Sequence, residues 1–229
     1  MWQTGLMTTL PDGRRILFFD VDGTLIDSFP AIKASFLHAL DEVGIPRPDA
    51  GFIASIAGPP METTLGRLNT DPAVVTAAME AYLAHQAHAA VGETRAFDGV
   101  GELLDELRAE GFYLSTATSK GEGICRRVLS HLGLLDKLDF IAAAEEFGGA
   151  RRTKEQVIAF ALDSLGLRER TADILMIGDR RHDIVGAAEF AIPTCAVTWG
   201  YGTAEEWDSA AWKADTTAEL KEIIHDFAR

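Results

Sequence analysis

A chain of 229 residues with 47% hydrophobic and 24% charged residues has an ordinary globular composition, with room for one large domain or one domain with an insertion. Lys and Arg number 21 against 35 Asp and Glu, a formal net charge of −14. The negative electrostatic field of such a charge argues against a nucleic-acid polymer or an anionic membrane as partner. No signal peptide is visible, and no apolar run is long enough to cross a bilayer, so we expect a cytoplasmic protein.

The first expected strand is the apolar run at residues 16–19, which leads directly into Asp20 and Asp22. A continuous apolar run of this kind is typical of a strand buried on both faces of a parallel sheet. Residues i and i+2 of an extended chain point the same way, so the two carboxylates should lie close together where the strand ends. Gly23 then allows the chain to turn away.

The next segment, residues 29–95, shows helical patterns and no strand. Asp27 and Ser28 can cap a helix that starts near Pro30. Further helices are expected at residues 49–57, 61–68 and 72–90. Because both flanks of this segment contain strands, we interpret it as an inserted helical domain.

From Phe97 onward, helices and strands alternate, which predicts βαβ units and a parallel sheet. Ligands bind beyond the carboxyl ends of such strands. Asp20 and Asp22, Thr118 and Ser119, and Asp179 all follow expected strands, so we expect them in one crevice. Helices are expected at residues 100–110, 122–132 and 154–165, after Asp183 to about Phe190, and from about Ala218 onward. The expected strands cover residues 112–117, 140–143, 174–177 and 194–197.

The pair of Asp20 and Asp22 limits the chemistry. Two carboxylates 4 Å apart repel by about 4 kcal/mol at an effective dielectric constant near 20. Such a pair persists when a cation lies between its members or when one member holds a proton. The first case is a hard-metal site and the second is a nucleophile beside a general acid. An isolated pair of this kind is more often just a polar strand end. Other motifs in the chain are therefore needed to show whether this pair is functional.

Four motifs follow one another in the order seen in a known superfamily. They are Asp20-Val21-Asp22-Gly23-Thr24, Thr118 at the end of a strand, Lys154 at the start of a helix, and Gly178-Asp179 with Asp183 four residues after Asp179. From Arg15 onward the chain resembles the haloacid dehalogenase-superfamily phosphohydrolases, in the phosphoglycolate-phosphatase-like branch with a helical cap. The resemblance implies an α/β fold with a Rossmann-like parallel-sheet core at residues 1–28 and 96–229, and an all-α cap domain at residues 29–95.

The resemblance also implies roles for the acidic residues. Asp20 would attack phosphorus and form an aspartyl-phosphate, and Asp22 would act first as general acid and then as general base. Magnesium would be held by Asp20, the backbone carbonyl of Asp22, Asp179 and the phosphate itself. Asp183 would orient a water molecule on the metal.

Phosphate recognition is implied for Thr118, through its hydroxyl, and for Ser119, through its amide. Lys154 would neutralise Asp20 and the transferring phosphoryl group. Two departures from the family pattern stand beside these roles. Glu155 follows the lysine where relatives often have proline, and Ser119 stands where many relatives have asparagine. The two arginines just before Thr153 compete with Lys154 for its role.

The substrate remains open within the family. Asp22 argues for phosphorus chemistry, because the superfamily's dehalogenases lack this second aspartate. The segment of Gly58, Pro59 and Pro60, followed by Arg67, resembles a substrate-facing cap segment, although a simple helix–helix turn explains the pattern equally well. We expect a small phosphorylated metabolite, with phosphoglycolate first. The alternative substrate is a nucleoside 5′-monophosphate. The alternative activities are a β-phosphoglucomutase-like mutase reaction and a non-catalytic binding module. We expect the protein to be a monomer or a homodimer.

Overall fold

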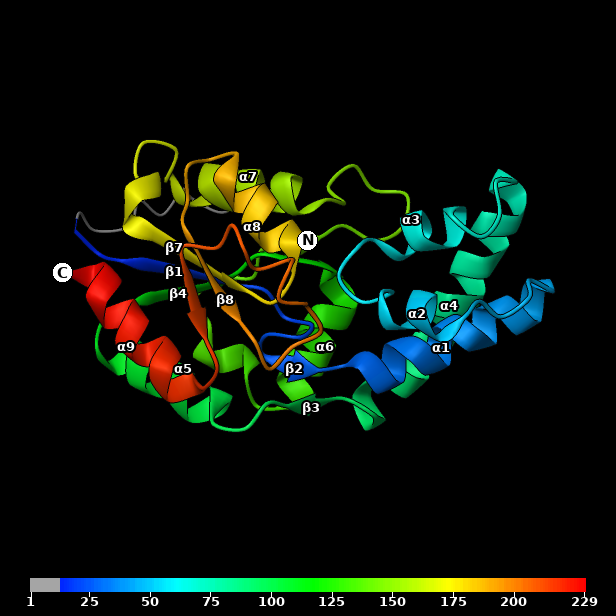
Figure 1. Cartoon of the computed structure of the whole chain (residues 1–229), viewed down its shortest axis with the longest axis horizontal. Coiled ribbons are helices and arrows are strands. Elements are labelled where there is room, and N and C mark those ends of the chain that lie inside the picture. The colour runs from blue at the N-terminus through cyan, green and yellow to red at the C-terminus, as the bar shows by residue number, and fades with distance from the viewer. Residues whose placement is uncertain (1–12) are drawn as a thin grey trace, which may run out of the picture.

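The computed structural model describes residues 13–229, and a five-stranded parallel sheet forms the centre of this described part (Figure 1). The strand order is β4-β1-β7-β8-β9. β1 therefore lies between β4 and β7, where Ile16 pairs with Tyr113 on one side and with Ile174 on the other. The bounds are β1 Ile16–Phe19, β4 Tyr113–Thr116, β7 Ile174–Gly178, β8 Thr194–Val197 and β9 Trp212–Ala214.

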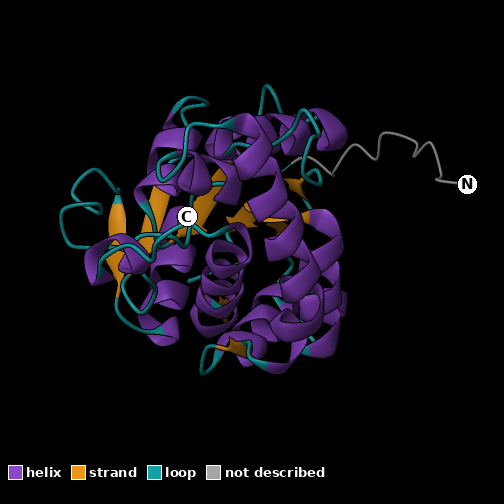
Figure 2. Ribbon diagram, turned by 90° about the vertical axis from the view of Figure 1, so that its right-hand side faces the viewer, coloured by secondary structure: helices purple, strands orange, loops and turns teal. Residues whose placement is uncertain are grey.

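Helices cover both faces of this sheet, which explains why β1 is apolar at every position. Leu17 and Phe19 pack in one hydrophobic cluster, and Ile16 and Phe18 pack in a second cluster on the opposite face. In Figure 1, α7 and α8 lie above the sheet and α5 and α9 lie below it, and Figure 2 shows the strands enclosed by helices. The bounds are α5 Val100–Ala109, α6 Glu122–His131, α7 Lys154–Leu165, α8 Arg181–Ala188 and α9 Thr217–Ala228. The expected α/β fold with a central parallel sheet is confirmed.

The segment of residues 29–92 is helical and has a hydrophobic cluster of its own. Phe36, Leu40, Leu65 and Met79 are among its buried members. These helices lie together at the right of Figure 1. Their bounds are α1 Phe29–Val43, α2 Ala50–Ala54, α3 Met61–Gly66 and α4 Pro72–Gly92. The two connections to the sheet run side by side as an antiparallel pair, β2 Ile26–Asp27 with β3 Arg95–Ala96.

Local sequence signals set several helix ends. Asp49 accepts a hydrogen bond from the amide of Phe52 at the start of α2, and Thr153 forms a capping box with Gln156 at the start of α7. Gly44 ends α1 in the left-handed conformation, with φ of 70°. Ser28 stands at the N-cap position of α1 but makes no side-chain capping bond, because its hydroxyl donates to Asp22 instead.

Some short elements carry no strong sequence signal. After β4 the chain continues as β5 Thr118–Gly121, which pairs in parallel with β6 Ala143–Ala144. Single helical turns, η1 Leu135–Lys137 and η2 Thr171–Asp173, precede β6 and β7. Within residues 13–229, none of the helices has the length and apolar character that a membrane span requires.

Candidate active site

The sheet order brings three distant parts of the chain to one edge. Asp20 follows β1, Thr118 opens β5 directly after β4, and Asp179 follows β7. The amide of Asp20 donates to the carbonyl of Ile177 at 2.8 Å, and the amide of Ala117 donates to the carbonyl of Phe19 at 2.7 Å. The end of β1 is therefore hydrogen-bonded to the ends of both β4 and β7, and the three strand ends lie at one edge of the sheet, as expected from the parallel arrangement.

A cluster of buried carboxylates occupies this edge. Asp20, Asp179 and Asp183 each offer one oxygen, and these oxygens lie within 4.8 Å of one another. Asp179 Oδ2 accepts from the amide of Tyr201 at 2.6 Å, and Asp183 Oδ2 accepts from the amide of Arg180 at 3.0 Å. Oδ1 of Asp179 is buried and has no hydrogen-bond partner within the described residues. A buried carboxylate oxygen that has no hydrogen-bond partner and lies beside two further carboxylates is well suited to bind a cation.

Burial makes this cluster costly without a cation. Burial raises the pKa of Asp20, and the charge of Asp183 raises it further, while Lys154 opposes both effects. Burial also raises the pKa of Asp179 well above its ordinary value, with the charges of Asp183 and Asp20 adding to the shift. Magnesium prefers oxygen ligands and commonly uses one or two carboxylates. The residues present therefore fit this ion.

Glycines allow the chain to enclose the Asp179 side chain. Gly23 has φ of 82°, and a Cβ added there would lie 2.2 Å from Asp179 Oδ2. A Cβ at Gly200 would lie 2.2 Å from the carbonyl oxygen of Gly23. Glycine is required at both positions, because any side chain would push the carboxylate out of the cluster.

Lys154 lies inside the cluster, as predicted from the sequence. Its ammonium nitrogen is 2.9 Å from Asp20 Oδ1 and 2.6 Å from Asp183 Oδ1, and it donates to the carbonyl of Ala117 at 2.7 Å. Burial alone would lower the pKa of Lys154, but the charges of Asp183 and Asp20 raise it above its ordinary value. The lysine is therefore charged at neutral pH, and it balances only part of the negative charge around it.

Asp22 faces away from this cluster. Lys120 Nζ lies 2.8 Å from Asp22 Oδ1 and 3.1 Å from Oδ2, and the Ser28 hydroxyl donates to Oδ1. The Lys120 side chain is only 4% exposed. Lys120 did not emerge from the sequence as a site residue. The available signal was its position two residues after Thr118, which places both side chains on one side of an extended strand.

The predicted phosphate contacts divide into two groups. Thr118 is buried, its hydroxyl accepts from the amide of Lys120 at 3.2 Å, and it also hydrogen-bonds Asp20. Ser119 lines the neighbouring cavity. Arg67 lies elsewhere, because its guanidinium carbon is 4.7 Å from the centre of the Phe52 ring and its side chain does not line that cavity. Its predicted role in substrate binding stays a prediction.

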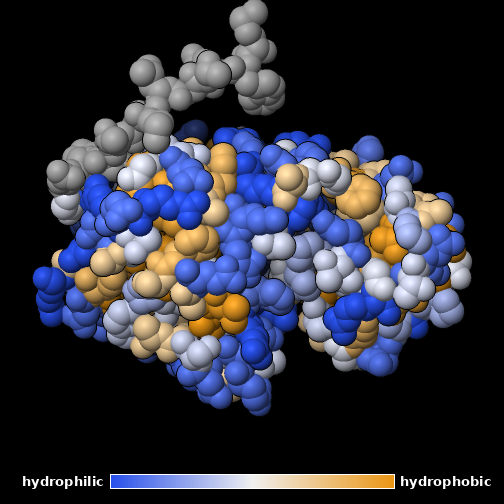
Figure 3. Space-filling view, turned by 90° about the horizontal axis from the view of Figure 1, so that it is seen from above, coloured by the Kyte–Doolittle hydropathy of each residue, from blue (hydrophilic) through white to orange (hydrophobic). Residues whose placement is uncertain are grey.

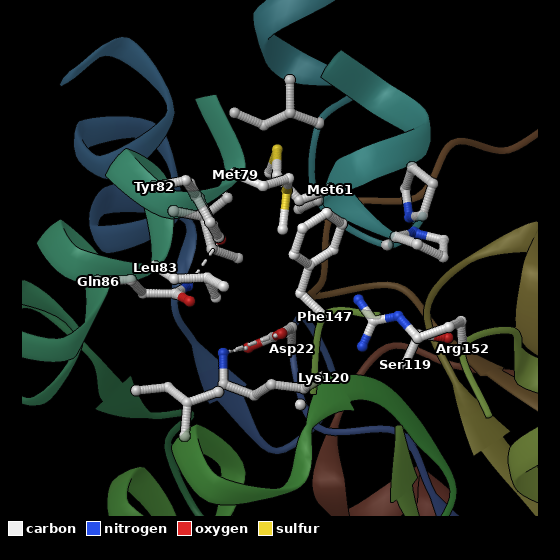
Figure 4. A pocket seen from close by; sticks show the side chains of 18 of the residues that line it. Asp22, Met61, Met79, Tyr82, Leu83, Gln86, Ser119, Lys120, Phe147 and Arg152 are labelled. Atoms are coloured by element: carbon white, nitrogen blue, oxygen red, sulfur yellow. Dashed lines mark hydrogen bonds and ion pairs between the residues drawn. The ribbon is translucent and has the colours of Figure 1, made fainter. Parts of the chain in front are cut away.

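A cavity between the sheet edge and the helices α1–α4 opens beside Asp22. Figure 4 shows Asp22 and Lys120 on one side of it and Met61, Met79 and Phe147 on the other. The predicted cap segment of Gly58, Pro59 and Pro60 also lines it. On the face shown in Figure 3, a notch separates the larger lobe from the smaller one. The cavity therefore has Asp22, Ser119 and Lys120 from the sheet edge among its lining residues.

Comparison with known proteins agrees with this geometry. Residues 17–197 match the family model described as haloacid dehalogenase-like hydrolase. The chain is 39% identical to tyrosine-protein kinase PtkA of Mycobacterium tuberculosis, over 92% of this chain and 72% of PtkA. It is 34% identical to a 5′-nucleotidase of Pseudomonas aeruginosa, over 83% and 85% of the two chains. A crystal structure described as a predicted phosphatase from Clostridium acetobutylicum superposes with a TM-score of 0.87 at 31% identity, covering 93% and 99%.

The chain therefore belongs to the haloacid dehalogenase-like hydrolases, and within that family it is a phosphatase.

Proposed function

We propose that the protein hydrolyses a small phosphomonoester in a magnesium-dependent reaction that passes through a phosphorylated Asp20. The observation that carries this proposal is the buried group of Asp20, Asp179 and Asp183 around the ammonium of Lys154. This arrangement supplies a nucleophile, a cation site and a fixed positive charge within one small volume. Phosphate monoesters are among the slowest compounds to hydrolyse unaided. Catalysis of phosphoryl transfer depends mainly on positioning the reactants and stabilising the charge of the phosphoryl group.

In the first step, a carboxylate oxygen of Asp20 attacks phosphorus and the bond between phosphorus and the leaving oxygen breaks. Asp22 gives its proton to that oxygen, so the leaving group departs as an alcohol. In the second step, Asp22 takes a proton from water as the water attacks phosphorus. The acyl-phosphate bond breaks, inorganic phosphate forms, and Asp20 is restored as a carboxylate.

Other side chains stabilise the charge on the phosphoryl group. Lys154 contacts Asp20 directly and would reach a phosphoryl oxygen at the same place. Thr118 and Ser119 would donate hydrogen bonds to the remaining oxygens. When bound to Asp20, the Asp22 carbonyl and Asp179, magnesium would supply positive charge to the phosphate oxygens. Asp183 would hold Lys154 and orient a water molecule on the metal.

We also propose that residues 29–95 act as a cap on a core made of residues 1–28 and 96–229. The paired strands β2 and β3 carry both connections, so Ser28 and Ala96 are the proposed hinges. Arg152 pairs with Glu62, and Arg180 donates to the carbonyl of Ala57, so both arginines join the core to the cap in the present arrangement. Closure would keep water from Asp20 until the phosphoenzyme has formed.

One observation favours a second candidate reaction. The chain is 39% identical to PtkA, which carries the name of a tyrosine-protein kinase. A phosphoryl group on Asp20 could pass to a tyrosine hydroxyl instead of to water. Incubating the protein with magnesium and ATP, then searching for phosphotyrosine by mass spectrometry, separates the two reactions. Hydrolysis alone predicts no phosphotyrosine.

The proposal is tested by phosphate release from phosphoglycolate, nucleoside monophosphates and hexose phosphates. The wild type should release phosphate only when magnesium is present, and Asp20→Asn should lose nearly all activity. Asp41→Asn serves as a matched control, because Asp41 forms an exposed ion pair with Arg47 outside the site. Release that survives in Asp20→Asn or in excess chelator contradicts the proposal.

A further inference from the structure

The cavity beside Asp22 has two cationic side chains among its described lining residues, Lys120 and Arg152. A substrate with a second anionic group, such as a carboxylate or another phosphate, needs a cation at that group. The partners of these two side chains therefore decide which leaving groups the cavity can accept.

Lys120 is already neutralised by Asp22. Its ammonium lies 2.8 and 3.1 Å from the two carboxylate oxygens, and the side chains are 4% and 15% exposed. An anion that recruited Lys120 would leave the Asp22 carboxylate, which the second step of the proposed hydrolysis needs as a base, without its partner in a nearly closed space. Removing one member of a buried pair carries a large penalty, because the other charge remains buried.

Arg152 is held by a cap helix. Its Nε lies 2.6 Å from Glu62 Oε1 and its Nη2 lies 2.9 Å from Oε2, so the guanidinium and carboxylate meet in a double hydrogen bond. Arg152 Nη1 also donates to the carbonyl of Glu145. With both cations paired, Glu146 adds a negative charge to the lining. An outer extension of the cavity contains Arg127 and this same Glu146, so its charges are balanced as well.

The opposite wall is apolar and polarisable. Figure 4 shows Met61, Met79 and Phe147 gathered across the cavity from Asp22. Methionine sulfur and aromatic rings make favourable contacts with flat, aromatic groups. Beside them Gln86 donates to the Tyr82 hydroxyl at 2.7 Å, which places polar atoms on an otherwise apolar wall. Such a wall suits a flat, uncharged group that carries a few hydrogen-bonding atoms.

We propose that the physiological leaving group is an uncharged, partly apolar alcohol with a flat portion, as in a nucleoside monophosphate or an aryl phosphomonoester. The inference rests on the proposed hydrolysis at Asp20 and refines its substrate class. It disfavours phosphoglycolate, whose leaving alcohol carries a carboxylate, although the sequence places that substrate first. It also disfavours a mutase reaction, because a bisphosphate intermediate needs a second phosphate site.

The test compares kcat/KM for four compounds: a nucleoside 5′-monophosphate, phenyl phosphate, phosphoglycolate and a hexose bisphosphate. The wild type should prefer the first two by about tenfold or more, the scale on which pocket contacts discriminate. Glu62→Gln should release Arg152, raise kcat/KM for phosphoglycolate and so narrow the preference. Asp41→Asn should leave the preference unchanged, because the Asp41–Arg47 pair is exposed and lies outside the cavity.

A wild-type preference for phosphoglycolate or the bisphosphate, with release still dependent on Asp20, overturns this inference and leaves the proposed hydrolysis standing. Release from none of the compounds overturns the proposed hydrolysis. In that case selectivity is read from binding, as the rise in melting temperature of Asp20→Asn with each compound and magnesium. Stabilisation by the nucleoside monophosphate above phosphoglycolate supports the inference, and the reverse order contradicts it.

Discussion

At the scale of single residues, Lys154 is a buried charge surrounded by acceptors. It is 3% exposed and contacts Asp20, Asp183 and the carbonyl of Ala117. Its neighbours are therefore arranged around a positive charge. The lysine contributes to folding as well as to the chemistry proposed for Asp20, because without it two carboxylates face each other in a buried site.

Replacing this charge with an apolar side chain tests both contributions. Lys154→Met should lower the free energy of unfolding by about 3 kcal/mol or more, because it leaves Asp20 and Asp183 buried without a cation. It should also abolish phosphate release. Denaturant unfolding, with and without magnesium, measures the first effect. A variant as stable as the wild type in the absence of magnesium contradicts this account of the cluster.

The carboxylate pKa values give a second prediction. The pKa values of Asp20 and Asp179 are raised in the folded protein, so in the range above the ordinary pKa the folded state holds more protons than the unfolded state. Without a metal, these two groups therefore favour folding less as pH rises from the ordinary aspartate pKa toward the raised values. Magnesium competes with the bound protons.

The rise in melting temperature caused by magnesium should consequently be larger at about pH 7.5 than at about pH 5. Scanning calorimetry at both pH values, with magnesium and with excess chelator in its place, measures the rise in melting temperature. A magnesium effect that is equal at both values, or larger at the acidic one, contradicts the assignment of the ion to this cluster.

Strand ends predict which residues meet at the site, whereas residues that reach the site only through tertiary contacts carry no such signal. Asp20, Thr118 and Asp179 could be placed together because parallel strands end at one edge of a sheet. Lys120 meets Asp22 across 98 positions of sequence, and the hydroxyl of Tyr201 meets the amide of Ser28 across 173. No local pattern in the sequence identifies the distant partner in such a pair.

At the scale of helices and strands, local chemistry predicted more than long-range pairing did. Helix ends at Asp49, Thr153 and Gly44 follow from capping rules, and the apolar strands follow from burial on both faces. β9 is short and begins with Trp212-Lys213, so its sequence has no apolar run to mark it. It forms because β8 offers an unpaired edge, a property of the assembled sheet.

Two hydroxyl residues that both stand at helix N-caps separate stability from chemistry. Thr153→Ala should cost about 1 kcal/mol of stability, because Thr153 caps α7 through its side chain. Ser28→Ala should cost less stability and lower kcat more, because the Ser28 hydroxyl binds Asp22 and does not cap α1. Unfolding curves and steady-state kinetics of the two variants check this. The opposite pattern would show that Ser28 is mainly a cap.

At the scale of the whole molecule, the net charge of −14 opposes the approach of a phosphorylated substrate. The proposed metal and Lys154 attract the phosphate only at short range, since mobile ions screen exposed charges beyond about 10 Å at 0.1 M salt. The long-range field and the local site therefore act in opposite directions on binding.

Salt should reveal this opposition. Raising sodium chloride from about 20 mM to about 150 mM at constant magnesium should increase kcat/KM for a dianionic phosphomonoester, because screening weakens the long-range repulsion. Initial rates at low substrate concentration measure it. A steep fall with salt would indicate an attractive field at the entrance and would contradict this description of the surface.

The central claim is that Asp20 itself becomes phosphorylated, and trapping that species tests it most directly. The protein is mixed with magnesium and its best substrate, quenched in acid within milliseconds and treated with borohydride, which reduces an acyl phosphate to an alcohol. Peptide mass spectrometry should then find homoserine in place of Asp20, only when magnesium and substrate were both present. Turnover with an unmodified Asp20, or reduction at a different aspartate, would contradict the mechanism.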